Sequence, residues 1–181
     1  MAGAVTITPE FSRLVRLDSL GAQPRVIPVE ADDAERGALA TRFDLVTLDR
    51  LEASTECTRD GDSVDVVGQL SADLVQSCVA SGEPVAARIE EIFRLRFVPA
   101  PSLESEAEEV ELSESDCDII GYTGRAIDLG EAVAETLGLA LDPFPRNPAA
   151  EEALRAAGVL SEEDAGPFAA LKGLKEKLGK N

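Results

Sequence analysis

The sequence predicts an α+β fold, in which an antiparallel β-meander sheet is covered by two main helices and followed by a peripheral C-terminal tail. Three consecutive stretches in the middle of the chain alternate apolar and polar residues, a period typical of strands with one buried face. Two other segments combine a helix-capping pattern with helically spaced apolar residues. We therefore expect an α+β domain over residues 1–146 of the 181, and a helical tail over 147–181.

The N-terminal part is expected to form two short strands and the first helix. Residues 11–17 keep several apolar side chains on one parity, and residues 24–31 form a second extended segment. Asp32 and Glu35 have the spacing of a capping box, with aspartate in place of the usual serine or threonine. The helix predicted over 32–43 has an apolar stripe made of Leu39, Ala40 and Phe43.

The meander is expected to contain strands at 48–57, 63–76 and 85–98. Asp60-Gly61 marks the first hairpin, because a tight reversed turn requires positive φ. The segment 81–84, which contains glycine and proline, marks the second turn. One face of the middle strand reads as continuously small or apolar: Val64, Val66, Gly68, Leu70, Ala72 and Leu74.

The polar side of the third strand carries three arginines, Arg88, Arg94 and Arg96. Ile92 interrupts this polar side, which leaves open either a bulge or a strand buried on both faces. The candidate contacts for RNA are these three arginines and two residues of the basic C-terminal end, Lys172 and Lys175.

A run of acidic residues follows the third strand. Residues 102–118 contain eight acids and no base, a composition typical of a solvated loop. The alternative is that this loop binds a partner. The residues that would then make the contact are Glu104, Glu106, Glu108, Glu109, Glu111 and Glu114.

A second helix is predicted over 129–141. Asp128 and Glu131 again have capping-box spacing, and Leu129, Val133 and Leu137 recur at four-residue intervals. Pro143 ends this helix and begins a stiff, proline-rich connector. A short helix over 149–157 follows, with Asn147-Pro148 as its cap and Gly158 as its end.

The charge balance restricts the class of partner. The chain has 35 acids and 17 bases, a net charge of −18, which repels bare nucleic acid and anionic membranes and favours basic proteins. The alternative is that the charge only maintains solubility. Three cysteines, an odd number far apart in sequence, predict no disulfide framework. With no signal-peptide pattern and no apolar run of about 18 residues, we expect a cytoplasmic protein.

The residue types argue against catalysis. The sequence has no histidine, which excludes Ser–His and Cys–His nucleophile systems and removes the commonest zinc ligand. No phosphate-binding loop or dinucleotide fingerprint occurs. Gly121 and Gly124 have the spacing of a KH-domain loop, but the acidic run before them favours an ordinary turn. We expect no catalytic residue, no bound metal and no cofactor.

Four segments carry short motifs in a fixed order: 35–43, 68–84, 127–146 and 167–172. Together they resemble the YceD family, also called the large ribosomal RNA subunit accumulation proteins, and the resemblance covers residues 11–175. The motif positions in this chain are Glu35, Arg36, Gln76, Cys78, Glu83, Pro84, Asp128, Leu129, Pro143, Pro145, Arg146, Pro167 and Phe168.

The resemblance implies a non-enzymatic role in the synthesis or stability of large-subunit ribosomal RNA. Many family members carry Cys-x-x-Cys in the central strand. Here Cys78 matches the second position, but Val75 occupies the first, which argues against metal binding. Gly166 replaces an asparagine common before Pro-Phe-Ala, a change expected to weaken a helix cap.

Three functional hypotheses follow from the residues and the resemblance. The leading one is a ribosome-assembly factor that binds a basic ribosomal protein through its acidic surface. The second is direct RNA binding, and the third is an enzyme of unknown reaction. The identity of the partner, the step affected and the oligomeric state stay open at the level of sequence.

Overall fold

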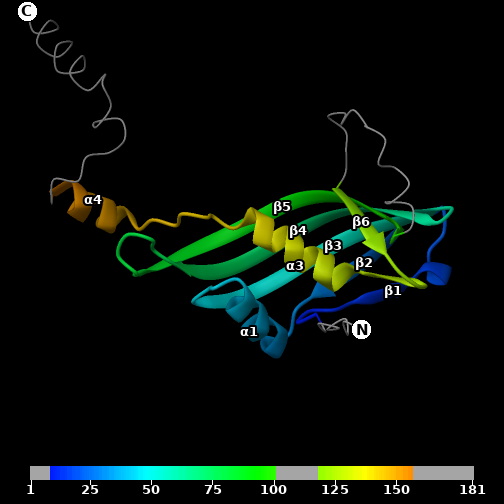
Figure 1. Cartoon of the computed structure of the whole chain (residues 1–181), viewed down its shortest axis with the longest axis horizontal. Coiled ribbons are helices and arrows are strands. Elements are labelled where there is room, and N and C mark those ends of the chain that lie inside the picture. The colour runs from blue at the N-terminus through cyan, green and yellow to red at the C-terminus, as the bar shows by residue number, and fades with distance from the viewer. Residues whose placement is uncertain (1–8, 101–117, 157–181) are drawn as a thin grey trace, which may run out of the picture. The chain divides into compact units, whose positions relative to one another are not determined.

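The computed structural model (Figure 1) describes residues 9–100 and 118–156 and confirms the α+β class. Within these ranges the helices are α1 (Asp33–Arg42), α3 (Leu129–Ala140), α4 (Pro148–Ala156) and the single 3-10 turn η1 (Leu17–Ser19). The strands are β1 (Leu14–Arg16), β2 (Arg25–Glu30), β3 (Thr47–Asp60), β4 (Ser63–Ser77), β5 (Pro84–Pro99), β6 (Asp118–Tyr122) and β7 (Ala126–Asp128). Among the described residues, no helix is both long and apolar enough to cross a membrane.

The chain divides into two compact units. Unit 1 contains the residues up to Gln76 together with Ala86–Pro143. Unit 2 contains Ser77–Val85, which is the turn between β4 and β5, and the residues from Phe144 onward. The boundary predicted after residue 146 stays a prediction.

The main sheet has the strand order β2-β3-β4-β5-β6, so the expected meander runs through neighbours that are consecutive in sequence. β2 and β4 both pair with β3 in antiparallel orientation. The prediction of a wholly antiparallel sheet is wrong at β6, which pairs with β5 in parallel. β6 begins opposite Leu95 and ends opposite Pro99, so the parallel pairing covers only the C-terminal part of β5.

A second, two-stranded sheet joins the two ends of unit 1, and the sequence patterns did not predict it. Val15 of β1 lies opposite Ile127 of β7. β1 is shorter than the extended segment predicted over 11–17, because the chain turns into η1 at Leu17. The N-terminal segment is therefore anchored next to the start of α3.

The hairpin between β3 and β4 forms where the turn signal predicted it. Gly61 has φ of +60°, the left-handed region that glycine adopts at little cost. From this turn the register pairs Asp60 with Ser63 and continues along both strands to a shift near Leu48. The predicted inward residues of β4 are all buried. Ile92 of β5 is 70% exposed, so that strand is not buried on both faces there.

The core lies between one face of the sheet and the helices α1 and α3 (Figure 1). α1 contacts β3, and α3 contacts β1 and β2. Gly68 leaves room for an aromatic ring, since a Cβ there would lie 2.2 Å from Cζ of Phe93. The predicted helical stripe of Leu129, Val133 and Leu137 is buried in this core.

The two predicted capping boxes have different outcomes. At α1 the box is closed: the Asp32 carboxylate accepts from Glu35 N (2.9 Å), and the Glu35 carboxylate accepts from Asp32 N (2.8 Å). At α3 Asp128 caps the helix, accepting from Gly130 N (3.0 Å) and Glu131 N (3.3 Å). The Glu131 carboxylate instead pairs with Arg42 at 2.9 Å, because a guanidinium is a stronger partner than a backbone amide.

In unit 2 the helix α4 begins one residue earlier than predicted, with Pro148 as its first residue. The Asn147 side-chain oxygen accepts from Ala149 N at 3.0 Å, which is the predicted cap. The predicted end at Gly158 lies outside the described residues.

Candidate functional site

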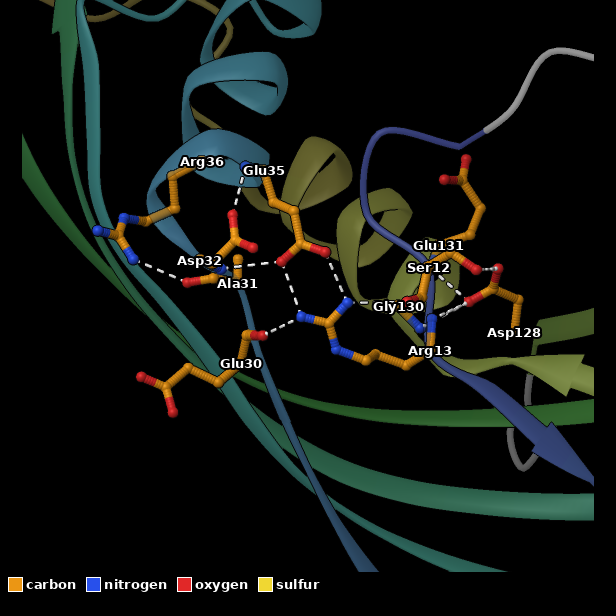
Figure 2. Close-up of polar contacts among 10 residues, drawn as sticks. All are labelled: Ser12, Arg13, Glu30, Ala31, Asp32, Glu35, Arg36, Asp128, Gly130 and Glu131. Carbon is orange, nitrogen blue, oxygen red and sulfur yellow. Dashed lines mark hydrogen bonds and ion pairs between the residues drawn. The ribbon is translucent and has the colours of Figure 1, made fainter.

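An ion-paired cluster joins the N-terminal segment to the starts of α1 and α3 (Figure 2). Arg13 donates to both carboxylate oxygens of Glu35, at 2.6 and 2.7 Å, and to the carbonyl of Glu30 at 2.6 Å. The guanidinium also lies over the ring of Phe11, 4.7 Å from its centroid. Such a bidentate, charge-assisted contact holds the segment in one geometry.

Asp128 holds the other side of the cluster. Its carboxylate accepts from the Ser12 hydroxyl (2.5 Å) and from Arg13 N (2.7 Å), in addition to capping α3. Gly130 permits this close approach, because a Cβ there would lie 2.8 Å from both the Phe11 carbonyl oxygen and Arg13 N. The first turn of α3 therefore packs directly on the backbone of the N-terminal segment.

The electrostatics keep this cluster charged. The hydrogen bond from Arg13 holds the pKa of Glu35 below its usual value, against the opposing effect of desolvation. The same bond raises the pKa of Arg13. The Glu35 and Asp128 carboxylates both accept hydrogen bonds from other residues of the chain. The cluster therefore has the features of a contact that stabilises the fold rather than of a reactive centre.

The cluster brings together residues that the sequence motifs placed far apart. Glu35 and Asp128 meet through Arg13, for which the sequence patterns indicated only a place in a strand. Arg36 closes the turn before α1 by donating to the Ala31 carbonyl (2.7 Å) and to Asp33 (2.5 Å). The available signal for Arg13 was an arginine on the same parity as Phe11 and Val15, but its partner could not be predicted from spacing.

The second cluster of motif positions is the turn at Cys78 in unit 2. Cys78 N donates to the Glu83 carbonyl and Gly82 N to the Cys78 carbonyl, both at 2.8 Å. Asn147 ties this turn to the connector before α4: its backbone N donates to Cys78 Sγ (3.3 Å), and its amide to the Glu83 carboxylate (3.1 Å). Val79 N donates to the carbonyl of Pro145 at 2.9 Å.

The Cys78 thiol is buried and surrounded by hydrogen-bond donors. A hydrogen bond from the Ser81 side chain, followed by that from Asn147 N, lowers the pKa of Cys78 to about 7. Cys57 differs, since burial in the sheet raises the pKa of its thiol. Within 9–100 and 118–156, no group of three or more cysteine, aspartate or glutamate side chains is arranged to hold a metal ion.

The remaining described motif positions lie on β4, β5 and α3 or in the segment that follows α3. The Gln76 amide donates to the Asp142 carbonyl at 2.9 Å, which ties β4 to the residues after α3. Leu129 is a core residue, and α3 ends at Ala140, shortly before Pro143. Pro84 begins β5, and Arg146 lies in the connector of unit 2. Two motif positions lie outside the described residues, Pro167 and Phe168.

The arginines of β5 do not form a free cationic row. Arg88 pairs with Glu90 at 2.6 Å, and Arg96 lies 3.6 Å from Asp65. Arg94 is exposed. Lys172 and Lys175 lie outside the described residues, as do the acidic positions Glu104, Glu106, Glu108, Glu109, Glu111 and Glu114.

The Gly-x-x-Gly segment forms the turn between β6 and β7, as predicted. Gly124 has φ of +79°. The Tyr122 hydroxyl donates to the Asp62 carbonyl at 2.5 Å, so this residue ties β6 to the β3–β4 hairpin. The geometry is that of an ordinary turn rather than of a loop leading into a helix.

One protein-family model, described as "Large ribosomal RNA subunit accumulation protein YceD", matches residues 66–175. No curated protein and no solved structure matches the chain. The matched residues include β4, β5, α3 and the Cys78 turn, whereas Arg13 and Glu35 lie before them.

Proposed function

Because more than half of its sequence matches that family, this chain belongs to the YceD family of large ribosomal RNA subunit accumulation proteins, and we propose that it acts by binding a basic ribosomal protein. The family description concerns the amount of an RNA and names no reaction. A non-enzymatic protein that stabilises an RNA-binding partner before assembly is consistent with such an effect.

The observation that carries the proposal is the pairing of the arginines with carboxylates. Ion pairs hold arginines in several parts of unit 1, including Arg13 with Glu35, Arg42 with Glu131, and Arg50 with Asp73. A guanidinium that already contacts a carboxylate has part of its charge neutralised and some of its donors occupied, so it attracts a phosphate less strongly. With 35 acids and 17 bases, the chain has more carboxylates than it has cationic side chains to pair with them.

This surface favours one class of partner for a physical reason. The field of an acidic protein speeds its encounter with a basic protein and slows its encounter with RNA, and salt weakens both effects. Direct RNA binding would rely on the three β5 arginines and on Lys172 and Lys175. Of the three arginines, Arg88 is paired with Glu90 and Arg96 with Asp65. The acidic run at 102–118 lies outside the described residues except for residue 118. From its composition, we propose that it also attracts the basic partner.

The experiment measures binding of the full chain to individually purified large-subunit ribosomal proteins and to large-subunit ribosomal RNA fragments. We expect one or more basic proteins to bind, with an association rate that falls as salt rises. We expect the RNA fragments alone not to bind. Tight RNA binding by the protein alone, with no bound ribosomal protein, would replace this proposal by the direct RNA-binding alternative.

A further inference from the structure

The face of the main sheet that is turned away from α1 and α3 carries exposed aliphatic side chains. Val26 of β2 is 63% exposed, and Val67 of β4 is 45% exposed. The register places Glu56 of β3 directly between them, because Val26 pairs with Glu56 and Glu56 pairs with Val67. A carboxylate is thus flanked by two exposed valines in one row across three strands.

Two further rows of outward-facing residues lie next to this one, on the side away from the β3–β4 turn. Pro28, Ser54 and Gln69 form the first row, and Glu30 and Glu52 lie opposite each other in the second. The surface is hollowed around Ser54, and the residues around the hollow include Glu30 and Glu52 together with Arg50 and Arg88, which are each paired with a carboxylate. We call these residues the β2–β4 strip: Val26, Pro28, Glu30, Glu52, Ser54, Glu56, Val67 and Gln69.

The charges of the β2–β4 strip are unbalanced. Like charges directly opposite on neighbouring strands are unfavourable, and Glu30 and Glu52 have that arrangement. Arg50 contacts Glu52 at 2.5 Å but also Asp73 at 2.7 Å and Ser71 at 2.8 Å, so its donors are divided. Among the described residues, neither the Glu30 nor the Glu56 carboxylate forms an ion pair.

Glu30 illustrates the imbalance (Figure 2). Only its backbone carbonyl accepts from Arg13, at 2.6 Å, and its side chain is directed away from the guanidinium. The carboxylate is therefore left for solvent or for a cation from another molecule.

We propose that the β2–β4 strip is the docking surface for the basic protein partner, and that the docked segment combines lysine or arginine with aliphatic side chains. This inference rests on the proposed function and names the surface through which the basic protein would bind. The valines supply apolar area, and the three glutamates supply charge complementary to a cationic segment. RNA would meet these carboxylates with its phosphates, and a second copy of the chain would bring glutamate against glutamate.

Two variants and one matched control test the surface. Val26→Thr with Val67→Thr removes apolar area without changing charge and keeps β-branched residues in the strands. Glu56→Lys reverses one charge of the strip. Glu135→Lys makes the same change in net charge on α3, which lies on the covered side of the sheet. Circular dichroism and melting temperature establish that each variant is folded.

The probes are a synthetic peptide of alternating lysine and valine and the ribosomal protein that binds the wild-type chain. We expect the double valine variant to weaken binding of both probes by about tenfold, and Glu56→Lys to weaken binding more than Glu135→Lys does. A charge effect that is equal for Glu56→Lys and Glu135→Lys, with no effect of the valine variant, would overturn the docking surface while leaving the proposed function intact.

Two other results have distinct meanings. If the peptide binds the strip but no ribosomal protein binds the chain, the surface holds and the proposed function fails. If the wild-type chain dimerises and the valine variant is monomeric, the strip belongs to a second copy, and this inference is overturned.

Discussion

Replacing Leu137 tests whether α3 is held on the sheet by its apolar stripe. Leu137 is 0% exposed and lies in the core with Leu129 and Val133. Leu137→Ala removes the buried part of the side chain and leaves a cavity that the surrounding core fills only partly. Leu139, two residues later on the same helix, is 83% exposed and provides a control of identical chemistry.

The expected magnitude follows from burial. A fully buried leucine changed to alanine lowers the free energy of unfolding by about 2–5 kcal/mol. For a chain of this size, a loss of about 3 kcal/mol lowers the melting temperature by roughly 6–12 °C. Leu139→Ala removes little buried area, and alanine is an excellent helix former, so we expect its effect to stay within about 0.5 kcal/mol.

The assay is urea unfolding followed by circular dichroism, with thermal melting as a second measurement. An effect of Leu137→Ala as small as the one expected for Leu139→Ala would refute the argument, because the buried leucine would then contribute no more than the exposed one. A destabilisation by Leu139→Ala that is as large as that of Leu137→Ala would mean that the outer side of α3 is also covered in solution.

Three further predictions concern other parts of the molecule. Gly68→Ala should destabilise the sheet, because the new Cβ would lie 2.2 Å from Cζ of Phe93. Gly37→Ala in α1 is the control for thermal melting: its Cβ meets no atom within 4 Å, so it should stabilise the chain by about 1 kcal/mol. Arg13→Met should lower the free energy of unfolding at neutral pH, and this loss should become smaller as pH falls through the lowered pKa of Glu35, because a protonated Glu35 gains nothing from a nearby cation. A loss that does not change with pH in urea titrations would contradict this linkage. In a chain with Cys57 and Cys117 changed to serine, the ultraviolet absorbance of the Cys78 thiolate should titrate near the pKa of about 7, and Ser81→Ala should move the midpoint to higher pH. An unchanged midpoint would show that the Ser81 side chain does not stabilise the thiolate.

Local patterns were sufficient for most of the secondary structure. The alternation in β4, the positive φ at Gly61 and the capping box at Asp32 depend only on residues a few positions apart, so sequence alone predicts them. The same holds for the cap of α4 at Asn147. The family resemblance is likewise a property of the sequence, because short motifs in a fixed order carry it, and the family match confirms it.

Contacts between distant segments were decided only by the tertiary structure. The bond between Arg13 and Asp128 joins residues 115 positions apart, and the parallel pairing of β6 depends on the route of the chain after β5. The partner of a charged side chain is likewise set by what the fold brings within about 4 Å, and spacing along the chain does not encode this. Glu131 therefore pairs with Arg42 rather than closing its own capping box, and Arg96 lies beside Asp65 rather than free for phosphate.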